Sequence, residues 1–260
     1  KSILEDLGLL DPILRHEAND VISTYRSRLT KGHEPGAWYG YHVLGVFQTD
    51  DAAAGYVNKG GDRMQPYAKA GDLKFRDLNG DGSIDNSDLT DLGAPWPSLT
   101  TGLTLELRYG HLDFRTEFYG SWGAKYFQNQ RLNMNPTGHL NFESGLAEQF
   151  WHGEGTSNTF PILRYPDQNG NFSKMSTFFL AKANFVKCNL MQLGFTIPKQ
   201  WTGGMKSLRI YGSVQNVFTI TKYPGLNPDL PWYSSVGYNG VDNFQAILPR
   251  TYLVGVDLSL

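Results

Sequence analysis

The feature that most constrains this chain is an alternation of apolar and polar side chains in its second half. From Leu103 to Tyr109 every second residue is apolar, and the residues between them are Thr, Glu and Arg. The next run, from Leu112 to Trp122, continues the pattern after Gly110-His111. Because successive side chains of a strand point to opposite faces, the pattern predicts a hairpin with one apolar and one polar face.

Three further stretches alternate in the same way: Met191 to Ile197, Leu208 to Ile220 and Tyr252 to Leu260. The connections between the alternating stretches are short and long in turn. Residues 198–206 make a short one, whereas 123–183 and 222–249 are long and rich in Asn, Gly, Pro and aromatic residues. Strands of about 9 to 11 residues with short turns at one end and long loops at the other are typical of outer-membrane barrels. A soluble sandwich has shorter strands and needs no such asymmetry.

The sequence therefore predicts an all-β fold, in which about five or six strands form part of a large antiparallel transmembrane β-barrel with long extracellular loops. That number is below the minimum of about eight strands for a closed membrane barrel. An open sheet edge cannot face lipid, because its backbone groups would lack hydrogen-bond partners. The chain is thus expected to be the C-terminal segment of a larger barrel, or one piece of a split barrel.

Composition narrows the classes of function. The net charge of −2 argues against a nucleic-acid partner. The single cysteine, Cys188, excludes an internal disulfide framework. The six histidines have no metal-ligand spacing and the sequence contains no G-x-S-x-G elbow, so the chain is predicted not to be an enzyme.

One stretch has the spacing of a calcium loop. Oxygen-bearing side chains occupy loop positions 1, 3, 5, 9 and 12, Gly82 occupies position 6, and the residue at position 7 can offer its carbonyl. A polar turn rich in Asp, Asn and Gly is the alternative interpretation, but such a turn does not need this spacing. The predicted ligands of a Ca2+ ion are Asp77, Asn79, Asp81, Ser83, Asp85 and Asp88.

Several stretches together resemble the C-terminal quarter of SusC/RagA-type TonB-dependent outer-membrane transporters of Bacteroidota. They extend from residue 36 to the end of the chain, and 123–183 has no counterpart among them. The matching stretches are Gly36 to Gln48, Gly71 to Asp85, Leu92 to Pro97, Asn189 to Pro198, Ser207 to Gly225 and Pro249 to Leu260.

The resemblance implies a barrel of about 22 strands in the outer membrane of a Gram-negative bacterium. It also implies an N-terminal plug, a SusD-like surface lipoprotein that covers the lumen, and TonB-driven import of oligosaccharides or peptides. The plug and the TonB-binding segment have no counterpart here, so TonB would act through a plug region that is not in this chain. The implied surroundings are the remainder of the barrel and the lipid bilayer. The substrate-binding residues stay unknown.

A periplasmic C-terminus, as the resemblance implies, gives the following expected division. Residues 1–33 are a possible strand or helix leading into the barrel, 34–98 are an extracellular loop with the calcium motif, 99–122 are a transmembrane hairpin, 123–183 are an extracellular loop, and 184–260 are transmembrane strands with an extracellular loop at 222–249. The alternative function is a secreted, calcium-stabilised β-sandwich that binds carbohydrate.

Overall fold

The computed structural model describes residues 3–6, 8, 13–15, 27–134, 145–231 and 239–259. The chain divides into two compact units. The unit called here the strand unit consists of residues 97–124, 182–230 and 245–260. The unit called here the loop unit consists of residues 1–96, 125–181 and 231–244.

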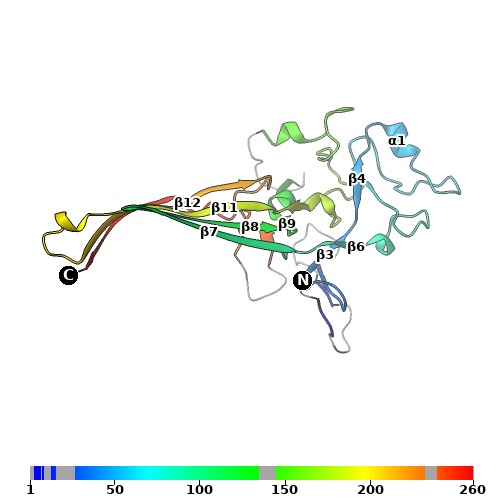
Figure 1. Ribbon diagram of the computed structural model, residues 1–260. Helices are drawn as coiled ribbons and strands as arrows, with labels where there is room; N and C mark the ends of the chain where they lie inside the picture. Colours follow the sequence, from blue (N-terminus) through cyan, green and yellow to red (C-terminus); the bar gives the residue numbers. More distant parts are fainter. Residues whose placement is uncertain are drawn as a thin grey trace. The chain divides into compact units, whose positions relative to one another are not determined.

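Five long strands of the strand unit form one antiparallel sheet in the described part of the chain, in the order β14-β12-β11-β8-β7 (Figure 1). The turn between β7 and β8 is two residues long, and the turn between β11 and β12 contains the 3₁₀ helix η5 (Lys199–Trp201). The strands are β7 (Leu99–Tyr109), β8 (Leu112–Trp122), β11 (Phe185–Thr196), β12 (Ser207–Thr221) and β14 (Thr251–Ser259).

The register of this sheet carries the sequence alternation from strand to strand. Leu107 is opposite Phe114, which is opposite Leu193, so apolar residues meet apolar residues across the sheet. One position along, Glu106 is opposite Arg115, and Arg115 is opposite Gln192. Each long strand therefore contributes to one apolar and one polar face, as the period of two requires.

The apolar face of this sheet is open among the described residues. Leu103 is 62% exposed, Leu107 54% and Val254 82%. A β-sandwich would bury such a face against a second sheet. The exposure therefore argues against the sandwich expected for a carbohydrate-binding module and agrees with a face that contacts lipid.

The backbone is irregular near the start of β11 and in the second half of β12. The register of β11 shifts between Cys188 and Leu190 against both of its neighbours. On β12, Asn216 has a φ of 51°, a conformation that Asn tolerates better than most residues. Such bulges increase local twist and re-aim the strand that follows.

The loop unit is built from short elements. Its strands form the sheets β1-β2-β3-β6, β10-β9-β13 and β4-β5. The strands are β1 (Ile13–Arg15), β2 (Ser27–Leu29), β3 (Ala37–Gly40), β4 (Val43–Val46), β5 (Leu73–Phe75), β6 (Thr90–Gly93), β9 (Lys125–Gln128), β10 (Leu180–Lys182) and β13 (Val241–Asp242). The helices are α1 (Asp50–Ala54) and the 3₁₀ helices η1 (Asn86–Asp88), η2 (Asn129–Met134), η3 (Ala147–Gln149) and η4 (Thr177–Phe179).

Aromatic rings form the core of the loop unit. Phe127 stacks on Phe179 with ring centroids 5.6 Å apart, and Phe172 meets Phe178 edge to face at 5.9 Å. Large rings bury much apolar area per residue, which suits a unit with few regular elements. The aromatic residues of this core are Trp38, Tyr41, Phe75, Phe127, Phe150, Phe172, Phe178 and Phe179.

Candidate functional site

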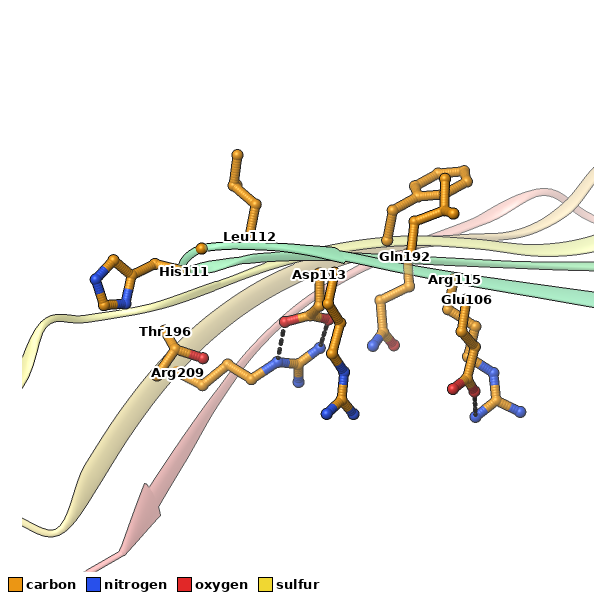
Figure 2. Close-up of a pocket in the computed structure, with 12 residues that line it drawn as sticks. Glu106, His111, Leu112, Asp113, Arg115, Gln192, Thr196 and Arg209 are labelled. Carbon is orange, nitrogen blue, oxygen red and sulfur yellow. Dashed lines mark hydrogen bonds and ion pairs between the residues drawn. The ribbon is translucent and has the colours of Figure 1, made fainter.

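A network of ion pairs crosses the polar face of the strand unit near its short turns. Arg209 on β12 donates to both carboxylate oxygens of Asp113 on β8, at 2.9 and 2.6 Å, and to Asp257 on β14 at 2.8 Å. Figure 2 shows Asp113 and Arg209 on one side of the sheet and Leu112 on the other. A bidentate arginine–carboxylate pair is among the strongest polar contacts, so it fixes three strands in register.

The Asp113–Arg209 pair spans an intervening strand, and a glycine makes room for it. Gly194 on β11 lies opposite Asp113 in the register. A Cβ atom at this glycine would lie 2.5 Å from Arg209 Nη2 and 2.5 Å from Asp113 Oδ1. The guanidinium and carboxylate therefore occupy the space above the backbone of β11 that a side chain would fill.

A second group of charges lies one step further along β8. Arg115 contacts Glu117 at 2.5 Å and Glu106 at 3.3 Å, and the contact with Glu106 is drawn in Figure 2. A recess of about 440 Å³ on this face is lined by charged residues of both groups, together with uncharged polar residues. The charged residues are Asp113, Arg209, Glu106 and Arg115, and the others include His111, Gln192 and Thr196. Such a concentration of exposed charge is typical of a wall that faces water.

The opposite face has the dimensions of a membrane-spanning surface. β7 is eleven residues long, which corresponds to about 33 Å at roughly 3.3 Å per residue. A strand tilted by about 40° would span about 25 Å of the bilayer normal, the height of the apolar band of outer-membrane barrels. Its outward residues from Leu103 to Leu107 are leucines at alternate positions, and Tyr109, 88% exposed, ends the row.

The predicted calcium loop follows β5 in the loop unit and ends with η1, and all six predicted ligands are described. Asp77 accepts hydrogen bonds from the backbone N–H groups of Gly80 at 2.7 Å and Gly82 at 2.9 Å. Asn79 Oδ1 accepts from the N–H of Asp81 at 3.0 Å, and Asp81 accepts from Ser83 at 2.8 Å. These bonds curl the backbone round the side chains of positions 1, 3 and 5.

The end of the loop is a capping box. Asp85 caps η1 by accepting from the N–H of Ser87, while Asp88 accepts from the N–H of Asp85 at 3.0 Å. Asp88 also accepts from Leu78 at the start of the loop, at 2.7 Å, and it is 1% exposed. The first turn of η1 therefore holds Asp85 at loop position 9 and Asp88 at position 12. Asp88 also connects the two ends of the loop, because it accepts hydrogen bonds from both of them.

The donor set of this loop fits a hard cation, because it consists of carboxylate, amide and carbonyl oxygens. Its acidic side chains are turned toward backbone N–H groups. Among the described residues, no three His, Cys, Asp or Glu side chains are gathered as a metal site. The loop therefore has the spacing of a calcium loop, and the calcium site itself stays a prediction.

Neighbours that the spacing did not indicate support this loop. A Cβ at Gly82 would lie 2.4 Å from the Cβ of Asn58, so the segment around Asn58 packs against loop position 6. Ser87 donates its hydroxyl to Asp85 at 2.6 Å and accepts from Asn79 at 2.7 Å. Its hydroxyl, together with the N–H of Ser87, lowers the pKa of Asp85 below its ordinary value. Only the position of Ser87 inside the loop could have indicated this role.

Six aromatic residues of the long loops are of the types that stack on sugar rings, and the three of them that the structure describes make contacts within the loop unit. Trp38 is buried and donates to the carbonyl of Lys125 at 2.7 Å. Trp96 donates to the carbonyl of Pro35, and Trp151 to Gln48. The remaining candidates, Trp232, Tyr233 and Tyr238, lie outside the described residues.

A buried polar cluster joins distant segments of the loop unit. Asp72 accepts from Asn171 at 2.9 Å and from Lys69 at 2.8 Å, and it pairs with Arg164 at 3.0 Å. Burial raises the pKa of Asp72 above its ordinary value, although all three of these contacts act to lower it. The cluster connects residues about 100 positions apart in the sequence and has the character of a structural tie.

No helix in the described part of the chain is long and apolar enough to cross a membrane. No family model matches the sequence. Three curated relatives are similar to it. TonB-dependent receptor P3 of Formosa agariphila is 27% identical over 77% of this chain and 19% of its own length. TonB-dependent receptor SusC of Bacteroides thetaiotaomicron is 27% identical over 71% of the chain and 17% of its own length. TonB-dependent receptor P26 of Formosa agariphila is 23% identical over 100% of the chain and 26% of its own length.

Solved structures agree with these relatives. The RagAB peptide importer in its open-open state matches 99% of this chain and 25% of its own, with 18% identity and a TM-score of 0.67. A further structure of the RagAB peptide transporter matches 96% of this chain and 24% of its own, with 18% identity and a TM-score of 0.68. At these identities the likeness concerns the fold, and it confirms the predicted all-β, barrel-type architecture.

The chain spans about a quarter or less of the proteins it matches. These relatives are receptors and transporters rather than enzymes, in agreement with the prediction of a non-enzymatic protein. They also confirm the outer membrane of Bacteroidota as the predicted location. The chain is therefore a homologue of part of the TonB-dependent receptors, SusC among them, and has the fold of the matching part of the RagAB structures.

Proposed function

We propose that this chain forms the C-terminal barrel portion of a TonB-dependent outer-membrane importer of oligosaccharides or peptides. The observation that carries the proposal is the sheet of the strand unit, whose open apolar face suits lipid and whose charged face suits a water-filled lumen. The relatives named as TonB-dependent receptors support the same role.

The proposed importer works with further parts. A SusD-like surface lipoprotein closes the lumen from outside, and TonB acts through a plug region outside this chain. The likeness to the structures of the RagAB peptide importer supports this assembly. In the part of the chain that the structure describes, the outer edges of β7 and β14 have no strand partner. They would pair with the remainder of the barrel, since unpaired backbone groups in lipid cost several kcal/mol each.

Uptake by cells tests the proposed import. Cells that lack the receptor carrying this chain should lose growth on a nutrient oligosaccharide or peptide mixture as sole source, and the restored gene should recover it. Detergent-solubilised receptor should also co-purify with a surface lipoprotein. Release of the receptor from membranes by carbonate without detergent would contradict the barrel, because a peripheral protein does not carry so apolar a face.

We further propose that the loop from Asp77 to Asp88 binds Ca2+ outside the cell. The six predicted ligands would hold the ion, which would supply a fixed positive charge to carboxylates that accept hydrogen bonds from backbone N–H groups, from the amide of Asn79 and from the hydroxyl of Ser87. The hydrogen-bonded curl at Asp77 and the capping box at Asp88 support this assignment. Extracellular calcium sites need only weak affinity, with dissociation constants of about 10⁻⁴–10⁻³ M. The ion would thus be a permanent clip.

Metal analysis of the purified receptor tests the calcium site. Asp77→Ala should remove bound calcium and should increase protease cleavage within residues 60–98. Asp51→Ala, a change of an exposed acid in α1, should leave both unchanged. Equal cleavage of the loop with and without a calcium chelator would contradict a structural ion.

A further inference from the structure

The pairing of β12 with β14 stops partway along β12. It ends at the Gln215–Thr251 pair, whereas β11 pairs with β12 as far as Thr221. In the described part of the chain, the edge of residues 216–221 that faces away from β11 therefore has no strand partner. The separation coincides with Asn216 and its positive φ of 51°, so it is built into the backbone.

A recess of about 510 Å³ opens along this free edge, between β12 and the segments 226–228 and 247–250. Side chains tether both segments: Asn216 donates to the carbonyl of Pro249 at 2.9 Å, and Asn227 donates to the carbonyl of Ala246 at 3.3 Å. This volume is within the range of about 300–1,000 Å³ that is usual for ligand pockets. We call this recess the β12 fork.

The lining of the β12 fork combines aliphatic walls with a surplus of positive charge. Leu226, Ile247 and Leu248 line it and are 58%, 67% and 49% exposed. Two cations also line it. Lys187 pairs with Asp229 at 3.2 Å, whereas Arg250 forms no ion pair with a described acid. The positive charge of Arg250 is therefore available to bind a ligand.

We propose that the β12 fork binds an extended peptide as an added strand, with the peptide's C-terminal carboxylate on Arg250. A free strand edge presents backbone donors and acceptors at regular spacing, and an extended peptide matches that spacing whereas a sugar or a lipid does not. The aliphatic walls suit the peptide's alternate side chains. The guanidinium of Arg250 suits a carboxylate. The inference rests on the proposed import function and selects peptides as its substrate class.

The test uses the purified receptor that carries this chain and a fluorescent hexapeptide of alternating valine and threonine with a free C-terminal carboxylate. We expect binding, and we expect it to weaken about tenfold or more when alternate residues are N-methylated in one of the two possible frames, because the pairing N–H groups are lost. Methylation in the other frame should have a much smaller effect. Equal binding of both methylated peptides and the parent peptide would overturn the added strand.

The carboxylate is tested separately. Amidation of the peptide's C-terminus should weaken binding to the unmodified receptor about tenfold, and Arg250→Gln should abolish the difference between acid and amide. Lys206→Gln, which changes an exposed cation at the opposite end of β12, should keep that difference. An acid–amide difference that persists in Arg250→Gln would overturn the role of Arg250.

Uptake separates this inference from the proposed function. Cells that import a neutral maltohexaose through the receptor, while the hexapeptide neither binds nor is imported, would keep the importer and refute the peptide site. Cells that import neither class of compound through it would contradict the proposed function itself.

Discussion

The two faces of β7 predict opposite responses to the same substitution at neighbouring residues. Leu105 lies on the apolar face near the middle of the strand, and Thr104 lies next to it on the polar face. In the proposed barrel, Leu105→Arg places a guanidinium in the bilayer midplane, whereas Thr104→Arg places it in the lumen beside Glu117, its cross-strand neighbour.

The expected free-energy cost of each substitution depends on how deep in the bilayer the new arginine lies. An arginine facing lipid at the midplane costs about 2–4 kcal/mol, falling to about 0–1 kcal/mol near the interface. Leu105→Arg should therefore lower the folded-to-unfolded ratio by roughly 30- to 700-fold. Tyr109→Arg, at the end of the apolar row, should cost little. Thr104→Arg should stay within about 0.5 kcal/mol of the unmodified protein.

Urea titration of the receptor, folded into phospholipid vesicles and followed by its heat-dependent mobility on detergent gels, measures these free energies. We expect Leu105→Arg to be the most destabilised variant, Tyr109→Arg the next and Thr104→Arg the least. Equal costs at Leu105 and Thr104, or a greater cost at Tyr109 than at Leu105, would refute the assignment of the apolar face to lipid.

Three further outcomes are expected. Gly194→Ala should displace the Asp113–Arg209 pair and lower the free energy of unfolding by about 1–2 kcal/mol in the same urea titration. This value is already reduced for solvent screening, because both side chains of the pair are partly exposed. Gly212→Ala, where a Cβ meets nothing within 4 Å, is the control, and equal costs for the two variants would contradict the role of the Asp113–Arg209 pair in joining the strands. The folded-state pKa of Asp72 is raised above the ordinary value of 3.8, so the folded state binds more protons between the two values. Stability of the loop unit should therefore fall as pH rises through that window and then level off. Asp72→Asn should flatten this fall in hydrogen-exchange protection of residues 69–73, and an unchanged profile would count against the assignment. The pKa of Asp85 is lowered in the folded state, so its stabilisation of the calcium loop should be lost as pH falls below about 3.8. Protease cleavage at 77–88 should then become faster, and in Asp85→Asn this cleavage should no longer depend on pH.

The strands of the sheet could be predicted because their information is local. Every second residue from Leu103 to Tyr109 reports on the same face, and a two-residue turn fixes the pairing with β8. The alternation is weak from Leu99 to Gly102, a stretch that contains Thr and Gly, although Leu99 already pairs with Trp122. The alternation therefore identifies the faces of the strand from Leu103 onward.

The loop unit could not be predicted in the same way because its contacts are distant. β13 pairs in parallel with β9 through Val241 and Phe127, and no local sequence pattern predicts this pairing. Phe127 and Phe179 look like ordinary loop aromatics until the chain brings them together. Contacts between residues far apart in the sequence produce no periodic pattern in the sequence itself.

The candidate sites also differ in whether their residues are close together in the sequence. The ligands of the predicted calcium loop follow from spacing alone, because Gly82 and the acids are close in sequence. The support from Asn58 and the ion pair of Asp113 with Arg209 depend on packing between separate segments. The β12 fork depends on where a pairing ends, which the sequence does not state.

Nitroxide accessibility along β7 tests whether this strand has one face in lipid and one in a wet lumen. Single spin labels would be placed from Leu103 to Arg108 in the membrane-embedded receptor, after Cys188→Ser removes the buried native thiol. We expect a period of two. Labels at Leu103, Leu105 and Leu107 should collide with oxygen dissolved in lipid, and labels at Thr104, Glu106 and Arg108 should collide with a water-soluble nickel complex. Accessibility that does not alternate, or that favours the nickel complex at the leucines, would contradict a strand with one face in lipid and one in a wet lumen.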